Sequence, residues 1–192
     1  MKVYFHLNEG GFSNCYLVVN EISNQAIIID PGKITKEIIA RIEDNHLNLS
    51  AVLITHNHGS HADGLKTLRK IYSPKVFAAD WTVAANDTTV ITGDGTTQIE
   101  GMQVSYLTIP GHTSDSVVYK IGSILFTGDV LLSGEIGKTN SSYSEYILRS
   151  NIEHKIFSQL DTTVLMPGHG PPSTLGAAKA IYNQNLTKKQ IN

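Results

Sequence analysis

The stretch His56-Asn57-His58-Gly59-Ser60-His61 places three histidines within six residues. Imidazole is the commonest protein ligand for borderline divalent metals, so this density predicts a metal site rather than ordinary packing. His56 and His58 are two residues apart, and on an extended segment their side chains point the same way. The apolar run at residues 51–54 comes just before and predicts a buried strand. Because ligands often bind at the carboxyl ends of such strands, this stretch is the first candidate site.

The whole chain, residues 1–192, is expected to form one domain, because this length suits a single core. A net charge of -2 supplies no basic field for nucleic acid, and no apolar run reaches membrane-spanning length. The first residues lack the apolar stretch of a secretory signal, and Cys15 is the single cysteine. We therefore expect a cytoplasmic protein with a small-molecule substrate and no nucleic-acid or membrane partner. The oligomeric state is not indicated.

Strand and helix signals divide the chain into two similar halves. In the first half, strands are expected at residues 15–19, 26–29, 51–54 and 76–78, and helices within 34–42 and 65–71. In the second half, strands are expected at 97–99, 102–107, 117–119, 124–126 and 163–166, and helices at 144–160 and 175–182. Two strand-then-helix halves predict an α+β fold in which two sheets pack face to face with helices outside.

Metal-competent residues occur in four separate loops, each of which follows an apolar strand. The loops contain His56, His58 and His61; Pro110-Gly111-His112-Thr113; Thr127-Gly128-Asp129; and Pro167-Gly168-His169-Gly170. A single loop of this kind would be weak evidence. Four of them, with small residues that let the backbone approach a ligand, indicate one metal centre.

This order of residues resembles the metallo-β-lactamase superfamily over nearly the whole chain. The family pattern is His-x-His-x-Asp-His, followed by a later His, an Asp and a last His. The local sequence is most similar to the glyoxalase II-like branch. The matching segments are Ile29-Asp30-Pro31-Gly32, Ile109-Pro110-Gly111-His112-Thr113, Thr127-Gly128-Asp129-Val130-Leu131, Gly134-Glu135-Ile136-Gly137-Lys138-Thr139 and Pro167-Gly168-His169-Gly170-Pro171-Pro172. The resemblance implies a four-layer αββα sandwich.

The resemblance also implies a metal-dependent hydrolase that acts on a thioester or related ester, like hydroxyacylglutathione hydrolase. Carried over by position, the first metal site is formed by His56, His58 and His112, and the second by His61 and His169, with Asp129 bridging the two. A metal-bound hydroxide would be the nucleophile, since a metal lowers the pKa of water from about 15.7 towards roughly 7. The cofactor implied is zinc, as one or two ions, and iron or manganese also suits these ligands.

Ser60 departs from the family pattern, which has Asp at this position and uses it to bind the second metal. Serine is neutral and a weak ligand for zinc or iron, so the second site is weakened. It is not abolished, because three protein ligands and water can hold a catalytic zinc. Three roles stay open for Ser60: a weak ligand with a catalytic part, a hydrogen-bond partner of metal-bound water, or a relic of lost activity.

Two further residues are assigned provisional roles. Asp30 is expected to accept the spare N–H of a ligand histidine, as carboxylates commonly do beside metals, although it also fits a simple Asp-Pro-Gly turn. Lys138 stands where glyoxalase-like relatives often carry Arg, and it either contacts a substrate anion or lies in solvent.

Two other functions compete with hydrolysis. A related branch consists of mononuclear iron persulfide dioxygenases, and its iron ligands correspond to His56, His112 and Asp129. Two histidines and a carboxylate form the facial triad of non-haem iron oxygenases. The other alternative is a metal-binding or sensing module without turnover, which the loss of Asp at position 60 favours and the retention of the other ligands opposes.

Overall fold

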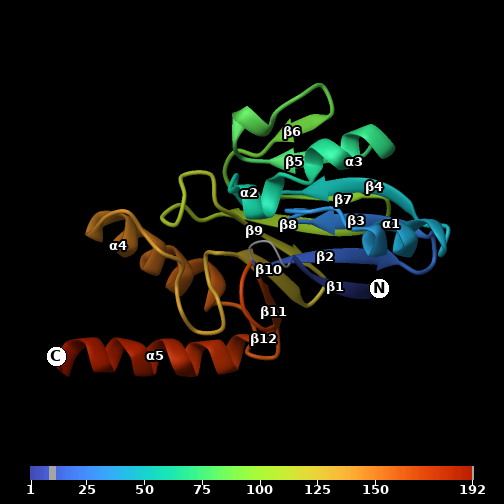
Figure 1. Cartoon of the computed structure of the whole chain (residues 1–192). Helices are drawn as coiled ribbons and strands as arrows, with labels where there is room; N and C mark the ends of the chain where they lie inside the picture. Colours follow the sequence, from blue (N-terminus) through green and yellow to red (C-terminus); the bar gives the residue numbers. More distant parts are fainter. Residues whose placement is uncertain (9–11, 192) are drawn as a thin grey trace.

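The computed structural model of the chain describes residues 1–8 and 12–191, in which two six-stranded sheets are flanked by helices (Figure 1). The first sheet has the order β1 (Lys2–Asn8), β2 (Ser13–Asn20), β3 (Gln25–Ile29), β4 (Asn48–Leu53), β5 (Lys75–Ala78) and β6 (Thr88–Val90). The second has the order β12 (Ser173–Thr174), β11 (Val164–Pro167), β10 (Ile124–Gly128), β9 (Val117–Ile121), β8 (Met102–Thr108) and β7 (Gly95–Ile99). The helical segments are α1 (Lys36–Glu43), α2 (Gly59–Ala62), α3 (Leu65–Ile71), η1 (Trp81–Val83), α4 (Ser142–Asn151), η2 (Ile152–Ile156) and α5 (Leu175–Ile191). None of the helices in the described ranges combines the length and the apolar composition that a membrane span requires.

Strand β2 shows why the molecule has four layers. Its side chains alternate between the two faces of the first sheet, as in any strand. Cys15, Leu17 and Val19 belong to the cluster that α1 and α3 cover, whereas Tyr16 and Val18 belong to the cluster between the two sheets. A third cluster lies between the second sheet and the helices α4 and α5. Helix, sheet, sheet and helix therefore stack in order, and the expected αββα sandwich is confirmed.

The carboxyl ends of several strands meet at one edge of the sandwich. In the second sheet, β8 and β10 are both antiparallel to β9, and β11 is parallel to β10, so β8, β10 and β11 run the same way. In the first sheet, β4 is parallel to β3 and β5. Two backbone hydrogen bonds join the sheets there, from Val117 N to Thr55 O at 2.8 Å and from Asn14 N to Gly168 O at 2.7 Å. The four loops singled out in the sequence all leave from this edge.

Several element boundaries differ from the prediction for local reasons. The helix expected at 144–160 is α4 followed by the π-helical segment η2, and it starts earlier because the Ser141 hydroxyl caps it by accepting from Ser144 N at 3.1 Å. The helix expected at 175–182 continues to Ile191. Strands β1, β6 and β12 were missed. The last two have only three and two residues, too few for an alternating pattern.

Candidate metal centre

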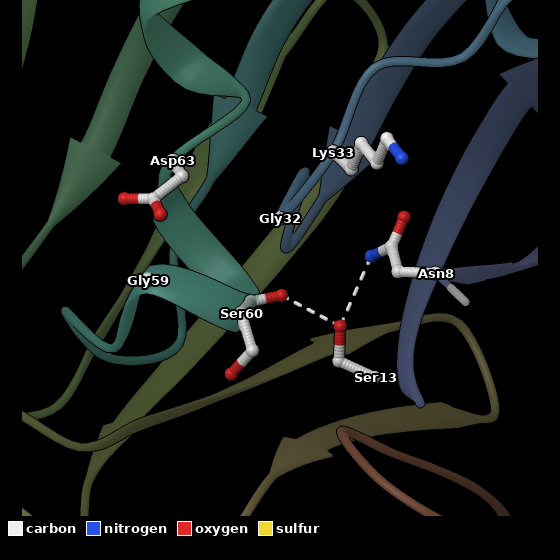
Figure 2. A pocket seen from close by; sticks show the side chains of 7 residues that line it. All are labelled: Asn8, Ser13, Gly32, Lys33, Gly59, Ser60 and Asp63. Carbon is white, nitrogen blue, oxygen red and sulfur yellow. Dashed lines mark hydrogen bonds between the residues drawn. The ribbon is translucent and has the colours of Figure 1, made fainter. Parts of the chain in front are cut away.

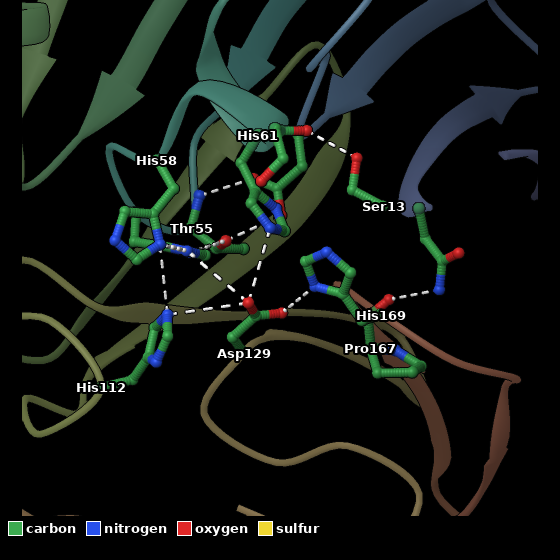
Figure 3. A network of polar contacts seen from close by, with 12 residues as sticks. Ser13, Thr55, His58, His61, His112, Asp129, Pro167 and His169 are labelled. Carbon is green, nitrogen blue, oxygen red and sulfur yellow. Dashed lines mark hydrogen bonds and ion pairs between the residues drawn. The ribbon is translucent and has the colours of Figure 1, made fainter. Parts of the chain in front are cut away.

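The structure brings the six candidate ligands together in two groups that share Asp129 (Figure 3). The first group is His56, His58, His112 and Asp129, and the second is His61, Asp129 and His169. Within each group, one nitrogen or oxygen atom from every residue lies within 4.8 Å of the others. Residues from four loops of two sheets therefore converge at one point, in the arrangement that a metal centre requires.

Ring nitrogens of the first group face one another at short range. His58 Nδ1 lies 2.9 Å from His56 Nε2 and 3.3 Å from His112 Nε2. His56 is buried, and its pKa falls to about 2, chiefly because burial disfavours the charged ring and also because His61 is close. His56 is therefore neutral, which is the form that binds a metal.

Hydrogen bonds behind the histidines determine which nitrogen is free. The Thr55 hydroxyl donates to Asp30 Oδ2 at 2.7 Å, so at 3.1 Å it can only accept from His56 Nδ1. His112 Nδ1 donates to the carbonyl oxygen of Lys138 at 2.7 Å, because a carbonyl only accepts. Both rings are thereby held with the Nε2 lone pair directed into the first group, as metal ligation requires.

His61 provides the most direct test of whether a metal fits the second group. Its Nδ1 atom lies 2.9 Å from Asp30 Oδ2, and the other nitrogen, Nε2, is buried and has no hydrogen-bond partner among the described residues. His61 Nε2 faces Asp129 Oδ2 at 3.7 Å, too far for a hydrogen bond. An unsatisfied buried polar atom is costly and calls for an explanation. A metal between His61 and Asp129 would satisfy it, so the residues present fit this cofactor.

Asp129 lies between the two groups. Its Oδ2 atom is 3.9 Å from His56 Nε2, 3.7 Å from His61 Nε2 and 3.6 Å from His112 Nε2. Its Oδ1 atom is 2.7 Å from His169 Nδ1. Burial alone would raise the pKa of Asp129, but the contacts with His169 and His61 outweigh burial and lower it well below its usual value. The carboxylate is therefore charged and directed towards both groups.

Asp30 lies beneath the candidate ligand His61. The residue is buried and has a φ of 51°, a left-handed conformation that Asp tolerates better than most residues. This turn after β3 directs Oδ1 to the backbone N–H of Thr55 at 2.8 Å and Oδ2 to His61. Burial would lower the pKa of His61, but the Asp30 and Asp129 carboxylates outweigh it and raise the pKa to about 10.

The loop that carries His169 is held by residues that sequence reasoning missed. The Asn14 side chain donates to Pro167 O at 2.9 Å and to Gly170 O at 2.7 Å. Tyr16 also donates its hydroxyl to Pro167 O, at 2.7 Å. These bonds bracket His169 on both sides. The available signal was a polar pair, Ser13-Asn14, directly before an apolar strand.

The loop that carries His56 and His58 is held through Asn57, which was also missed. Asn57 N donates to Asp115 Oδ2 at 2.8 Å, and its side chain donates to Asp80 Oδ2 and Thr82 Oγ1, both at 2.9 Å. Two segments distant in the chain, one at Asp115 and one at residues 80–82, therefore fix one exposed asparagine. The two histidines on either side are positioned as a consequence.

Close backbone approach explains two glycines of the site. A Cβ atom at Gly168 would lie 2.6 Å from both Asp129 Oδ1 and His61 Cε1. A Cβ atom at Gly137 would overlap the carbonyl oxygen of Asp129 and lie 3.0 Å from His112 Nδ1. Any larger residue would displace a candidate ligand, so these positions require glycine.

Ser60 and Lys138 are placed by the structure without a demonstrated chemical role. Ser60 lies on the short helix α2, is half-buried, and accepts a hydrogen bond from the Ser13 hydroxyl through its carbonyl oxygen at 2.6 Å. Lys138 is exposed, and its carbonyl rather than its side chain contacts His112. The roles of the Ser60 hydroxyl and the Lys138 ammonium stay predictions.

An open cleft of about 500 Å³ adjoins His112. Its walls come from the loop after β8 and from the start of α4, including Pro110, Asn140, Tyr143 and Ile147. Tyr143 is 74% exposed, so its ring is available to a ligand. The cleft offers apolar surface with a few polar groups beside the candidate ligands, which is typical of a small-molecule site.

Comparison with known proteins agrees with this geometry. The sequence model described as the metallo-beta-lactamase superfamily matches residues 8–80 and 82–186. Hydroxyacylglutathione hydrolase from Chromohalobacter salexigens is 31% identical over 157 residues, which cover 80% of this chain and 60% of that protein. Hydroxyacylglutathione hydrolase GloC from Haemophilus influenzae is 27% identical over 190 residues, which cover 86% of this chain and 89% of that protein. The crystal structure of the B3 metallo-beta-lactamase BLEG-1 superposes with a TM-score of 0.80 at 25% identity, over 92% of this chain and 95% of that one.

Proposed function

Because the chain belongs to the metallo-β-lactamase superfamily, we propose that it is a metal-dependent hydrolase that cleaves a thioester or related ester of a small molecule. The observation that carries the proposal is the convergence of three histidine rings on Asp129, with their outer nitrogens already hydrogen-bonded. These hydrogen bonds orient the rings independently of metal binding. The similarity to two hydroxyacylglutathione hydrolases supports a thioester substrate, although the chain spans only 60% of the first of them.

His56, His58 and His112 would hold a first metal with Asp129, and His61 and His169 would hold a second with the same carboxylate. A bound divalent metal supplies Lewis acidity, which polarises a carbonyl and makes water more acidic. The protein's own contribution is orientation. Asp30 and the Lys138 carbonyl hold protons at the outer Nδ1 atoms of His61 and His112, so the inner nitrogens point into the two groups, and a metal would displace the second proton of His61.

The cleft beside His112 is where we place the substrate. It opens directly onto a candidate ligand, and Tyr143 and Ile147 provide apolar contact for an acyl or thiol group. Asn140 and Ser144 line the same cleft and provide hydrogen-bonding groups. A substrate held there would present its carbonyl to the first group.

Metal content and thioester hydrolysis test the proposal together. The full chain is purified without chelator or added metal, and metal identity and stoichiometry are measured by plasma mass spectrometry. We expect close to one tightly held equivalent of zinc, with a second acquired on titration, and hydrolysis of simple acyl thioesters detected by thiol release. Bound metal without hydrolysis of thioesters or esters would overturn the proposed reaction.

A persulfide dioxygenase is the second candidate, and the unequal groups favour it. The first group keeps all its histidines and Asp129, whereas the second has Ser60 where the family pattern has a carboxylate. His56, His112 and Asp129 match the two-histidine, one-carboxylate ligand set of mononuclear iron. One equivalent of iron, with oxygen consumption on addition of a persulfide, would favour this reaction over hydrolysis.

A further inference from the structure

Strand β1 is an edge strand of the first sheet, and its outer side pairs with no other strand among the described residues (Figure 1). On its inner side it pairs with β2 in a regular register, from Lys2 opposite Val19 to Asn8 opposite Ser13. Side chains reinforce the last pair, since Asn8 Nδ2 donates to Ser13 Oγ at 3.0 Å and the Ser13 hydroxyl donates to Ser60 O at 2.6 Å (Figure 2). β1 is therefore a firmly anchored strand whose outer row of backbone N–H and C=O groups faces no strand of its own sheet.

The other three edge strands of the described sheets are short or polar. β6 has three residues and β12 has two, while β7 has the sequence Gly95-Thr96-Thr97-Gln98-Ile99. Natural proteins protect edge strands by shortness, charge, proline or bulges, because an open edge can pair with another chain. β1 has seven residues and no proline, and Lys2 at its start is its one Lys, Arg, Asp or Glu residue. It is therefore the edge strand best suited to pair with another chain.

Apolar side chains on one face of β1 are only partly covered by the rest of the chain. Val3, Phe5 and Leu7 share this face, since alternate residues of a strand point the same way. Val3 packs against the cluster between the sheets, and the Phe5 ring lies 5.8 Å from the ring of Tyr16. Phe5 and Leu7 are nevertheless 48% and 47% exposed. Open apolar surface therefore lies beside the open backbone edge.

The positive charges near β1 are held within their own chain. Lys2 Nζ lies 4.8 Å from the centroid of the Tyr4 ring, and Arg41 Cζ lies 4.6 Å from it. The N-terminal ammonium of Met1 pairs with Glu21 at 2.9 Å. These contacts leave the middle of the strand without a charge that would repel a second copy.

We propose that two copies of this chain associate through β1, so that their first sheets join into one continuous sheet. A two-fold axis normal to the sheet makes the two strands antiparallel, and it keeps Phe5 of both copies on the same face. An axis centred on Phe5 pairs every residue of β1, whereas an axis centred on a neighbouring residue leaves two residues of each strand unpaired. The association is independent of the proposed hydrolase reaction.

The order of residues in β1 matches this symmetry, which is why a second copy fits the edge. On the apolar face, Phe5 lies opposite the partner's Phe5, and Val3 lies opposite the partner's Leu7. Aromatic and aliphatic pairs of this kind stabilise neighbouring strands. The pairs on the other face are polar and bring no like charges together: Tyr4 with the partner's His6, and Lys2 with the partner's Asn8.

The mass of the protein in solution tests the association. One pair of strands is a small interface, so we expect a weak dimer that forms with rising concentration. Analytical ultracentrifugation of the full chain from about 1 to about 200 μM should show the mean mass rising from 20.9 kDa towards twice that value. A mass of one chain throughout this range would overturn the proposal.

A charge at the axis provides the matched variant. Phe5→Lys places two like charges opposite each other and should weaken association at least about tenfold. Ile22→Lys adds the same charge at an exposed apolar residue between β2 and β3, and it should leave association unchanged. Unchanged association in a folded Phe5→Lys protein, checked by circular dichroism, would refute the pairing.

Disulfide formation tests the register and does not depend on Phe5→Lys folding. Cys15 is buried and is the single native cysteine, so a cysteine on β1 supplies the accessible thiol. In Phe5→Cys the two thiols lie opposite each other, with Cα atoms about 4.5–5.5 Å apart, which a disulfide can span. Leu7→Cys lies on the same face with nearly equal exposure, but its two copies are four residues out of register, about 13 Å apart.

We therefore expect mild oxidation to cross-link Phe5→Cys into a dimer at least about fivefold more than Leu7→Cys, as electrophoresis without reductant measures. Equal cross-linking of the two variants would overturn the register centred on Phe5. No cross-linking in Phe5→Cys, at a concentration where the wild type is dimeric, would show that the copies meet through another surface.

Discussion

His61 Nδ1 lies 2.9 Å from the Oδ2 atom of Asp30, and both residues are buried. The bond joins a candidate ligand after β4 to the turn after β3. It fixes the ring so that Nε2 faces Asp129, and Asp30 is held in turn by Thr55. The orientation of the second group therefore depends on a carboxylate that does not itself face the metal.

Replacing Asp30 with Asn should weaken the second metal more than the first. An Asn side chain has one acceptor oxygen for the three donors that Asp30 now accepts from Thr55 and His61. Loss of such a contact commonly costs about 10–100-fold in metal affinity, and we expect that range here. A zinc titration monitored by calorimetry measures the affinity of both metal sites. Asp44→Asn, an exposed change of the same chemistry, is the control. Unaltered affinity in Asp30→Asn would contradict the orienting role.

Ser60→Asp should raise the affinity for the second metal, because it restores an anionic ligand next to His61. Metal stoichiometry per chain at limiting zinc measures the effect. Ser73→Asp, on the exposed surface, controls for added charge. Unchanged stoichiometry in Ser60→Asp would mean that the side chain at position 60 does not face the metal centre.

His112→Ala should abolish metal binding at the first group and with it the activity, since a nitrogen ligand and its contact with the Lys138 carbonyl are both removed. Metal content and thioester turnover are measured on the same preparation. His154→Ala is a matched control, because His154 is exposed and bonds only to Ser150 O of its own helix among its described contacts. Retained activity in His112→Ala would refute its assignment.

Asn14→Ala should disturb the loop that carries His169. The Gly170 carbonyl loses its side-chain donor, and the Pro167 carbonyl, which also accepts from the Tyr16 hydroxyl, loses one of its two side-chain donors. We expect the free energy of unfolding to fall by about 1–3 kcal/mol and the second metal to bind more weakly. Urea unfolding and zinc titration measure the two effects. Asn20→Ala is the control, because the two bonds it loses, to Glu100 O at 3.4 Å and from Ile22 N at 3.1 Å, are both exposed. Full second-site affinity in Asn14→Ala would show that the loop holds its shape without it.

The metal-free protein should lose stability as the pH rises above 7. The pKa of His61 is raised from 6.5 to about 10 in the folded state, so its contribution to stability is complete below pH 6.5 and is lost as the pH rises through 10. The lowered pKa of His56 changes the stability of the folded state only below pH 6.5, so His56 does not affect the stability between pH 7 and 10. Urea unfolding in chelator between pH 7 and 10 should show a steeper decline for wild type than for His61→Gln. Parallel curves would contradict the raised pKa.

The fold and the candidate ligands could be predicted from the sequence because both depend on local patterns. Alternating and helical hydrophobic periods predicted most of the strands and helices, and histidines next to glycines indicated the metal site. Short edge strands such as β6 and β12 were missed because two or three residues are too few to show an alternation of apolar and polar residues. The end of α5 was missed because its last turns are polar.

The sequence by itself therefore determined the layered αββα architecture and which side chains could bind a metal. Tertiary structure alone decided which atom of each side chain faces the centre and what holds it there. His61 is oriented by a residue 31 positions away, and the loop of His169 is clamped by Asn14, which is 153 positions from Pro167. Such hydrogen bonds leave no local pattern, because their geometry exists only once the two sheets have packed together and their loops meet at one edge.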